Sequence, residues 1–227
     1  MGPAGAAMIF AGKITAASLS KTKTASSSDT TDTSTYSIAS ISIGTASSDR
    51  LVVVAFGAHF AGVTAPSISS VTIAGSAATI DKSLVASGGT DGQITAICSR
   101  LVTTGTTMTL AVNFSHTARH LWYAVWSVTG SAAAAASSTV SDTVDTLALT
   151  LNCPAGGAIF ACCAQQLGST TTWTNLTEDQ DDTVETNFQY SAASDVFATA
   201  QTSLAVVADS ADTAIDIMGG VAVSYGP

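Results

Sequence analysis

Apolar and polar residues alternate with a period of two through most of the chain from Tyr36 onward. The segment SISSVTIAG shows the pattern cleanly, with Ile68, Val71 and Ile73 as its apolar residues. Successive side chains on a β-strand point to opposite faces of a sheet, so this period is typical of strands with one buried face. The run SAAAAASS, with alanine at 132–136, is the only local helix signal, and it is too short for a stable helix, which needs about 12 residues. The sequence therefore predicts an all-β fold, with a loop or a single turn at this run.

The expected strands form two sets, one on each side of the alanine run. They cover 36–43, 50–60, 67–74, 94–102, 108–114 and 121–128 in the first set, and 146–152, 157–167, 183–193, 201–208 and 219–226 in the second. In the first strand, Tyr36 is out of phase with Ile41 and Ile43, which predicts a bulge near Ser40. The strand 50–60 is apolar on both faces, which indicates a central strand that is covered on both sides.

The two sets also resemble each other. SISIGTASSDRLVVVAFGA and LALTLNCPAGGAIFACCAQ share an alternating strand, a polar or glycine turn, and a strand that is apolar on both faces. Two Greek-key halves of one sandwich, at 36–130 and 139–227, would produce this likeness, and so would two small tandem sandwiches. No Pro/Gly-rich linker with a charge run separates the halves. We therefore expect a single antiparallel β-sandwich domain over residues 36–227, of the jelly-roll or Greek-key kind.

Residues 1–35 have a different composition from the rest of the chain. Lys13, Lys21 and Lys23 are three of the seven basic residues, and no acidic residue precedes Asp29. The Ser/Thr-rich centre of this segment has few large apolar side chains, so it cannot bury enough surface to offset the entropy of ordering it. We expect an extended N-terminal arm, which is either a floppy terminus or a basic extension that orders against a partner. In the second case the three lysines are interface residues.

Charge and hydropathy exclude some partners. The chain has 16 acidic and 7 basic residues, a formal net charge of −9, and we expect no nucleic-acid partner because phosphate binding relies on clustered Lys and Arg. The start MGPAGAAMIFAGK has no basic residue before its apolar stretch, so a cleaved secretory signal is not expected. The longest apolar run, Leu51–Val63, is shorter than the roughly 20 residues of a membrane helix, and we expect no membrane span.

The four cysteines are expected to be buried free thiols. Cys162 and Cys163 are adjacent, so on a strand they would enter different environments, and Cys98 and Cys153 are distant in sequence. Two disulfides are the alternative, although the spacing does not resemble the dense framework of small secreted domains. Zinc has less support, because the chain has no Cys-x-x-Cys pair.

No catalytic motif is present, and we assign no catalytic residue. The chain has no nucleophile elbow, no Walker loop and no His-Glu-x-x-His pair. His116 and His120 are four residues apart and would share a face, but a metal site needs a third ligand, and Ser115 and Arg119 are poor ones. We expect two loop histidines that flank the start of a strand.

An acidic stretch is the densest charge in the chain. It contains Glu178, Asp179, Asp181, Asp182 and Glu185. Five carboxylates in eight residues repel one another unless water or a cation separates them. Calcium takes oxygen ligands, but the spacing misses the D-x-D-x-D-G pattern of calcium loops. We expect a solvated loop with no cofactor, and bound calcium is the alternative.

Aromatic residues divide between core and surface. Trp122 and Trp126 share one face of an expected strand and Tyr123 lies on the other, a pattern that favours packing in the core over a carbohydrate platform. Trp173, in the segment TTTWTN, is the better candidate for an exposed contact, and we count it as an interface residue.

The chain resembles a diffuse group of tailed-bacteriophage virion proteins, the β-sandwich modules of head decoration, collars and tail fibres. The features that carry the likeness are the apolar start AAMIFAGK, the unit SISIGTASSDRLVVVAFGA, the segment SSVTIAGSAAT, the aromatic strand ending in WSVTG, and the closing GGVAVSYGP. The resemblance implies a homo-oligomeric, often trimeric, structural protein of the capsid or tail. It carries over no site residue.

The composition agrees with a role in assembly. Ala, Thr and Ser make up 104 of the 227 residues, and small side chains lose little entropy when an interface buries them. We expect a non-enzymatic capsid decoration or cement protein of the virion, with copies of itself and the major capsid protein as partners. A tail-fibre or adhesin module that binds host surface glycan through Trp173 and the acidic stretch is the alternative. A polysaccharide-degrading enzyme ranks last.

Overall fold

The structure is a computed structural model, and it describes residues 18–130, 133–142, 145–167, 169–212 and 217–227. These residues form β-strands in antiparallel sheets, which confirms the predicted all-β sandwich class. The strands are β1 (Ser20–Asp29), β2 (Thr33–Ser42), β3 (Leu51–Phe60), β4 (Ile68–Ile73), β5 (Ser76–Ala77), β6 (Thr79–Gly88), β7 (Asp91–Leu101), β8 (Thr107–Ala118), β9 (His120–Thr129), β10 (Ala133–Asp142), β11 (Thr146–Cys153), β12 (Ala158–Gln166), β13 (Thr171–Thr174), β14 (Thr177–Val184), β15 (Phe188–Val196), β16 (Gln201–Ser210) and β17 (Ile217–Gly226). In this part of the chain no helix is long and apolar enough to cross a membrane.

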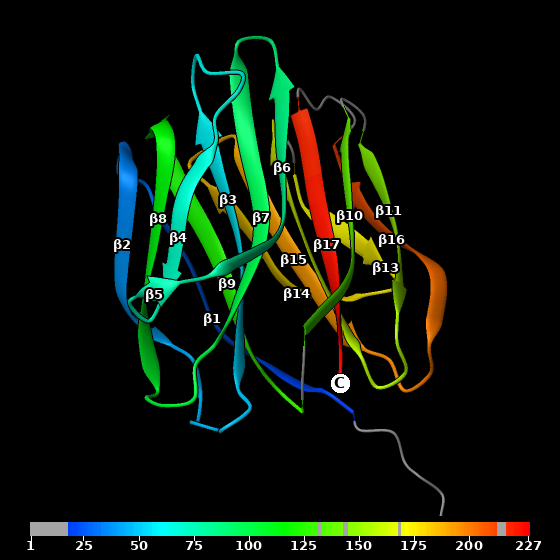
Figure 1. Cartoon of the computed structure of the whole chain (residues 1–227). Coiled ribbons are helices and arrows are strands. Elements are labelled where there is room, and N and C mark those ends of the chain that lie inside the picture. The colour runs from blue at the N-terminus through cyan, green and yellow to red at the C-terminus, as the bar shows by residue number, and fades with distance from the viewer. Residues whose placement is uncertain (1–17, 131–132, 143–144, 168, 213–216) are drawn as a thin grey trace, which may run out of the picture.

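Four sheets stack as four layers (Figure 1). The two inner sheets have the strand orders β1-β9-β3-β7-β6 and β10-β17-β12-β15-β14, and the two outer sheets have the orders β2-β8-β4-β5 and β11-β16-β13. Apolar side chains fill each of the three spaces between neighbouring layers. The middle core joins the inner sheets and contains Trp122, Trp126, Phe160 and Tyr190. Each inner sheet is therefore covered on both faces.

The strand order occurs twice along the chain. In the first unit, residues 20–129, β1 pairs with β9, β2 with β8 and β3 with β7. In the second unit, residues 133–226, β10 pairs with β17, β11 with β16 and β12 with β15. Pairing of the first strand with the last, and of the second with the last but one, is the pattern of a jelly roll. The protein is therefore two jelly-roll sandwiches in tandem, packed through their inner sheets.

This arrangement differs from the single sandwich that the sequence favoured, and it matches the alternative of two tandem sandwiches. The units also begin earlier than the halves expected at 36–130 and 139–227. The reason is the same at both boundaries. The first strand of each unit consists mainly of Ser, Thr and Ala, so it has no apolar alternation that a reading of the sequence could detect.

Residues 20–35, which were expected to belong to the N-terminal arm, are part of the folded body. β1 is the edge strand of an inner sheet and pairs with β9 from Ser20 opposite Thr129 to Asp29 opposite Leu121. Backbone hydrogen bonds to a buried strand order this segment without apolar side chains of its own. Residues 1–17, and with them Lys13, lie outside the described residues.

From Ala133 onward the alanine run lies in a strand and not in the expected loop or turn. β10 begins at Ala133 and pairs with β17 along its whole length. Five alanines favour a helix only weakly, and the ladder to a buried strand outweighs that preference. By contrast, the predicted bulge near Ser40 is confirmed by a register shift between Ile38 and Ile41 and by a φ of 61° at Ser40. The strand β3 is buried at every position, as its sequence indicated.

A buried arginine fastens the turns at one end of the first unit. Arg50 is 0% exposed, and its guanidinium donates hydrogen bonds to the backbone oxygens of Val102 at 2.8 Å and Gly44 at 2.9 Å. Two more bonds reach the oxygens of Thr104 and Gly105, at 2.8 and 2.9 Å. Carbonyl dipoles thus take the place of a carboxylate around this cation.

The seam, which we define as the space between the two inner sheets, has approximate two-fold symmetry. β1 lies against β14, β3 against β12, and β6 against β10 and β17. The first strand of each unit therefore faces the edge strand at the far side of the other unit's inner sheet, which is β14 or β6. Within the seam, the ring of Tyr190 occupies the space that a Cβ atom on residue 57 would need, so this position requires glycine.

Candidate functional site at the seam

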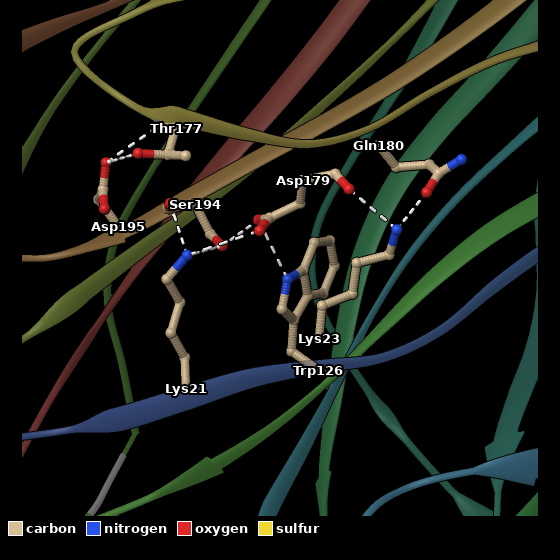
Figure 2. A network of polar contacts seen from close by, with 8 residues as sticks. All are labelled: Lys21, Lys23, Trp126, Thr177, Asp179, Gln180, Ser194 and Asp195. Carbon is tan, nitrogen blue, oxygen red and sulfur yellow. Dashed lines mark hydrogen bonds and ion pairs between the residues drawn. The ribbon is translucent and has the colours of Figure 1, made fainter.

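A polar cluster forms where β1 and β14 meet across one edge of the seam (Figure 2). The Asp179 carboxylate accepts hydrogen bonds from Trp126 Nε1, at 3.1 Å, and from the Ser194 hydroxyl. Lys21 Nζ lies 3.7 Å from the same carboxylate and donates to the backbone oxygen of Ser194 at 2.6 Å. The Lys21 and Asp179 side chains are only 17% and 15% exposed, so their attraction is screened less than that of a surface pair. This cluster fastens the first strand of the chain to the second unit.

The second lysine of β1 extends the same contact. Lys23 Nζ donates to the backbone oxygen of Asp179 at 2.9 Å and to the side-chain oxygen of Gln180. The Ser26 hydroxyl donates to that Gln180 oxygen at 3.0 Å. The structure therefore brings together two of the expected interface lysines, Lys21 and Lys23, but their partner is the other half of the same chain.

A bulge gives β14 its polar face toward the seam. The register to β15 shifts between Glu178 and Gln180, and Asp179 is the extra residue. Further along β14, Asp182 accepts a hydrogen bond from Trp122 Nε1 at 2.8 Å. Both buried tryptophans of β9 thus give their N–H groups to carboxylates of the second unit, as buried indoles require.

The acidic stretch is consequently not the solvated loop that the sequence predicted. It lies mainly on β14, and donors from β1, β9 and β13 bind its Asp179, Asp182 and Asp181 carboxylates, the last through the backbone N–H of Thr171, which donates to Oδ2 at 3.2 Å. The Oδ1 atom of Asp181 is buried without a hydrogen bond, and Glu178 is exposed. Strand alternation sends Asp181 and Asp182 to opposite faces. Among the residues that the structure describes, no three His, Cys, Asp or Glu side chains are grouped to hold a metal ion, and the calcium alternative gains no support.

The opposite edge of the seam repeats this design with different chemistry. A register shift between Ile80 and Lys82 makes Asp81 the extra residue of β6, as Asp179 is on β14. Asp81 accepts a hydrogen bond from the Tyr225 hydroxyl of the second unit at 2.8 Å, and another from Ser99 on the neighbouring strand. Burial raises the pKa of the Asp81 carboxyl, which its two hydrogen bonds only partly oppose.

Two histidines are buried at the end of the seam near the β14–β15 turn. His59 and His120 are opposite each other on β3 and β9, with ring centroids 6.0 Å apart, and Phe188 of the second unit packs on both. His120 Nε2 lies 2.7 Å from the Tyr190 hydroxyl. Neither His59 nitrogen makes a hydrogen bond, and Nδ1 of His120 makes none either.

The charged groups around these rings lie mainly at the rim. Asp91 is 3.3 Å from His59 Nε2, and Glu185 is 3.8 Å from His120 Nδ1 and 3.6 Å from Arg119. Burial is the main cause that lowers the pKa of both imidazoles, and it lowers that of His120 to about 3. The nearby Arg119 adds to the effect on both rings, and the Asp91 carboxylate opposes it at His59. Both rings are therefore neutral near pH 7.

The prediction that His116 and His120 are two loop histidines is wrong. His116 is exposed on β8, whereas His120 is fully buried at the start of β9. His120 packs instead on His59, which the sequence analysis did not single out. The available signal was a histidine inside LVVVAFGAHF, where both faces of a strand were expected to be buried.

Trp173 is not the exposed contact that the sequence suggested. It lies on β13, is partly buried against the core of the second unit, and donates from Nε1 to the Ser191 hydroxyl at 2.8 Å. The predicted core role of the β9 aromatics is confirmed: Trp122 and Trp126 enter the seam, and Tyr123 enters the core on the other face.

The cysteines are free and buried, as predicted. Cys162 lies in the seam, and Cys163 lies in the core between the second unit's sheets. Burial raises the pKa of each thiol, with that of Cys153 at about 11 and that of Cys163 at about 12. All four are therefore uncharged thiols near neutral pH, and such thiols react slowly.

The arrangement at the seam is one that holds two sandwiches together, through a desolvated ion pair, indole and phenol hydrogen bonds to carboxylates, and stacked rings. Its polar groups point at one another across an interface between the units. No protein-family model, no curated protein and no solved structure matches this chain.

Proposed function

We propose that the protein is a structural subunit of a bacteriophage virion, a capsid decoration or cement protein that stabilises the shell through contacts between copies and with the major capsid protein. The observation that carries this proposal is the chemistry of the two outermost sheet faces. One face presents Thr35, Ser37, Ser70, Thr72, Thr109, Ala111 and Asn113, and the other presents Thr146, Ala148, Thr150, Asn152, Thr172, Thr174, Ala205, Val207 and Asp209. Only Asp209 in these two sets carries a charge.

Such faces suit close assembly for two physical reasons. Short side chains lose little rotamer entropy when an interface immobilises them. Uncharged groups also cost little to desolvate, and hydroxyls can exchange hydrogen bonds with water for bonds across the interface. The stack behind the faces is rigid by construction, because each inner sheet packs on both sides.

The jelly-roll topology supports the same proposal. Jelly rolls are a recurrent building block of viral capsids, and they also occur as lectin domains. The topology alone does not choose between these two uses. The nearly uncharged outer faces and the resemblance of the sequence to phage virion modules favour the capsid.

The glycan-binding alternative depended on Trp173 and the acidic stretch. Trp173 packs against the core with its N–H bonded to Ser191, and Asp179 and Asp182 of β14 already have protein donors. A sugar ring would find the Trp173 indole only partly exposed and, of the four β14 carboxylates, only that of Glu178 in an exposed position, so these observations favour the assembly role.

Sedimentation velocity on the purified chain tests the proposal, together with mass spectrometry of phage particles from a strain that carries the gene. We expect the wild-type chain to self-associate and its peptides to be found in intact particles. Ala111→Arg and Ala148→Arg each place a charge at the centre of one outer face. At least one of them should weaken association by about tenfold, or about 1.4 kcal/mol.

Thr103→Arg is the matched control, because it adds the same charge on the exposed β7–β8 turn, away from both faces. Its sedimentation should equal that of the wild type. A wild-type chain that stays monomeric at high concentration and is missing from the particles would refute the proposal.

A further inference from the structure

An apolar groove opens at the edge of the first unit, between β6 of the inner sheet and the start of β4. It has a volume of about 230 Å³ and is lined by Pro66, Ser67, Ile68, Ile80, Ser83, Val85 and Ile94. Ile80 and Val85 are 38% and 42% exposed, which is unusual for side chains of this size. β6 is also the last strand of its sheet, so within the described residues its outer backbone groups have no strand partner.

The second unit closes the equivalent opening with its own chain. The matching bulges align β6 with β14, and Ser83 then corresponds to Asp181. Asp181 accepts a hydrogen bond from the backbone N–H of Thr171 at 3.2 Å, which holds β13 against β14. Trp173 of β13 then reaches inward to Ser191. In the first unit the same place is open and apolar, so a segment from outside this unit could bind there.

We propose that the groove of one copy receives residues 6–11 of a second copy, with Met8, Ile9 and Phe10 as the side chains that fill it. An extended peptide can pair with an edge strand while its side chains enter apolar pockets beside that strand. These three are the only consecutive large apolar residues in 1–17, and this segment lies outside the described residues. The inference rests on the proposed self-assembly and names the contact that produces it.

Chain length decides that the donor is another copy. The register across the inner sheet places Ser83, at the middle of the groove, in line with Ser27 of β1 at the opposite edge. Crossing the sheet spans about 19 Å, and the nine residues back along β1 to Ser18 span about 30 Å, so the groove lies about 35 Å away in a straight line. The eight residue-to-residue steps from Phe10 to Ser18 extend over at most about 28 Å. Phe10 therefore cannot reach the groove of its own copy.

Sedimentation velocity on full-length variants tests this contact. The double variant Ile9→Asp/Phe10→Asp changes the donor, and Ile80→Arg/Val85→Arg changes the acceptor at two exposed positions that the fold does not need. Each should raise the dissociation constant at least tenfold relative to wild type, whereas Thr103→Arg should leave it unchanged. Circular dichroism melts check that the variants remain folded.

Crosslinking identifies the partners directly. Phe10→Cys and Val85→Cys proteins, mixed and treated with a short bis-maleimide, should give a covalent dimer, while each protein alone should give far less. The native cysteines are buried and should not compete. A wild-type chain that associates normally, with no mixed crosslink and no effect of either double variant, overturns the inference and leaves the proposed function standing. A wild-type chain that never associates overturns both.

Discussion

The two edges of the seam use the same backbone device with different chemistry. At one edge Asp179 is desolvated beside Lys21 and the Trp126 indole, and at the other Asp81 is desolvated beside the Tyr225 phenol and makes no ion pair with any described residue. Each aspartate is the extra residue of a bulge in an edge strand of its unit's inner sheet, β14 or β6. A bulge aims one side chain away from its regular alternation. The difference shows that the backbone bulge, which both units share, fixes where a carboxylate enters the seam. The side chains that contact the carboxylate determine whether it forms an ion pair there.

Removing Trp126, which like Trp122 is among the largest side chains that cross the seam, should reduce the free energy of unfolding most. Trp126→Ala deletes a fully buried indole and leaves the Asp179 carboxylate without its N–H donor. We expect a loss of about 3–5 kcal/mol in the free energy of unfolding. Val223 occupies the corresponding register position in the second unit. Val223→Ala should cost about 2 kcal/mol, because it removes only apolar surface. Urea unfolding measures both, and equal losses would contradict the asymmetry between the edges.

Acid should act mainly on the histidine end of the seam. The folded-state pKa of His59 and of His120 lies below the ordinary value of 6.5, so protons bind the unfolded chain more tightly. Their contribution to stability is complete above pH 6.5 and is lost as the pH falls toward the folded pKa, about 3 for His120. At pH 5 the loss should be about 2 kcal/mol for His120, and His59 should add a further loss in the same direction.

Urea midpoints at pH 7.5 and pH 5 measure this dependence. The variant His59→Gln/His120→Gln should lose most of the difference between the two midpoints, whatever its stability at neutral pH. His116→Gln, at an exposed position, should keep it. The groups that face the rings are Asp91, Glu185, Arg119 and Tyr190, and an unchanged pH dependence in the double variant would assign the effect to them.

The aspartates themselves provide the finest comparison. Asp179→Asn removes the charge that Lys21 faces and turns an amide N–H₂ toward other donors, which should cost about 1–2 kcal/mol at pH 7. Burial raises the pKa of Asp81, so its ionised form weakens the fold as the pH rises above the unfolded value. Asp81→Asn should therefore change stability by less than about 0.5 kcal/mol, or increase it. Thermal melts at pH 7 measure both, and a larger loss at Asp81 would reverse the comparison.

The features that could be predicted from the sequence are those set by residues within a single strand. The alternation around Ile68–Ile73, the bulge at Ser40 and the doubly buried run 51–60 are local patterns, and each appears in the structure. The strands β1 and β10 were missed because their Ser, Thr and Ala residues owe their order to pairing with strands about 100 residues away. Local propensity contains no information about such a partner.

The seam could not be predicted for a similar reason. Lys21 and Asp179 are brought together only when two sandwiches pack face to face, and the aim of Asp179 depends on a one-residue bulge. The acidic stretch was visible as a charge cluster, but Lys21 and the indole N–H groups that bind its carboxylates come from β1 and β9, far away in the sequence. Charge density alone therefore predicted that water surrounds these carboxylates, whereas side chains of the first unit bind several of them.

Arg50 has a consequence for the order in which the molecule comes apart. The guanidinium is held by backbone oxygens, and amide carbonyls do not change their charge between mildly acidic and neutral solution, unlike imidazoles and carboxylates. A fall in pH that weakens the contact between the two sandwiches therefore leaves the hydrogen bonds of Arg50 intact. In a molecule whose seam has opened, the backbone amides of loops 43–50 and 101–106 should thus stay protected from hydrogen exchange. Unfolding in acid should begin at the seam between the two sandwiches and reach the Arg50 end of the first sandwich later.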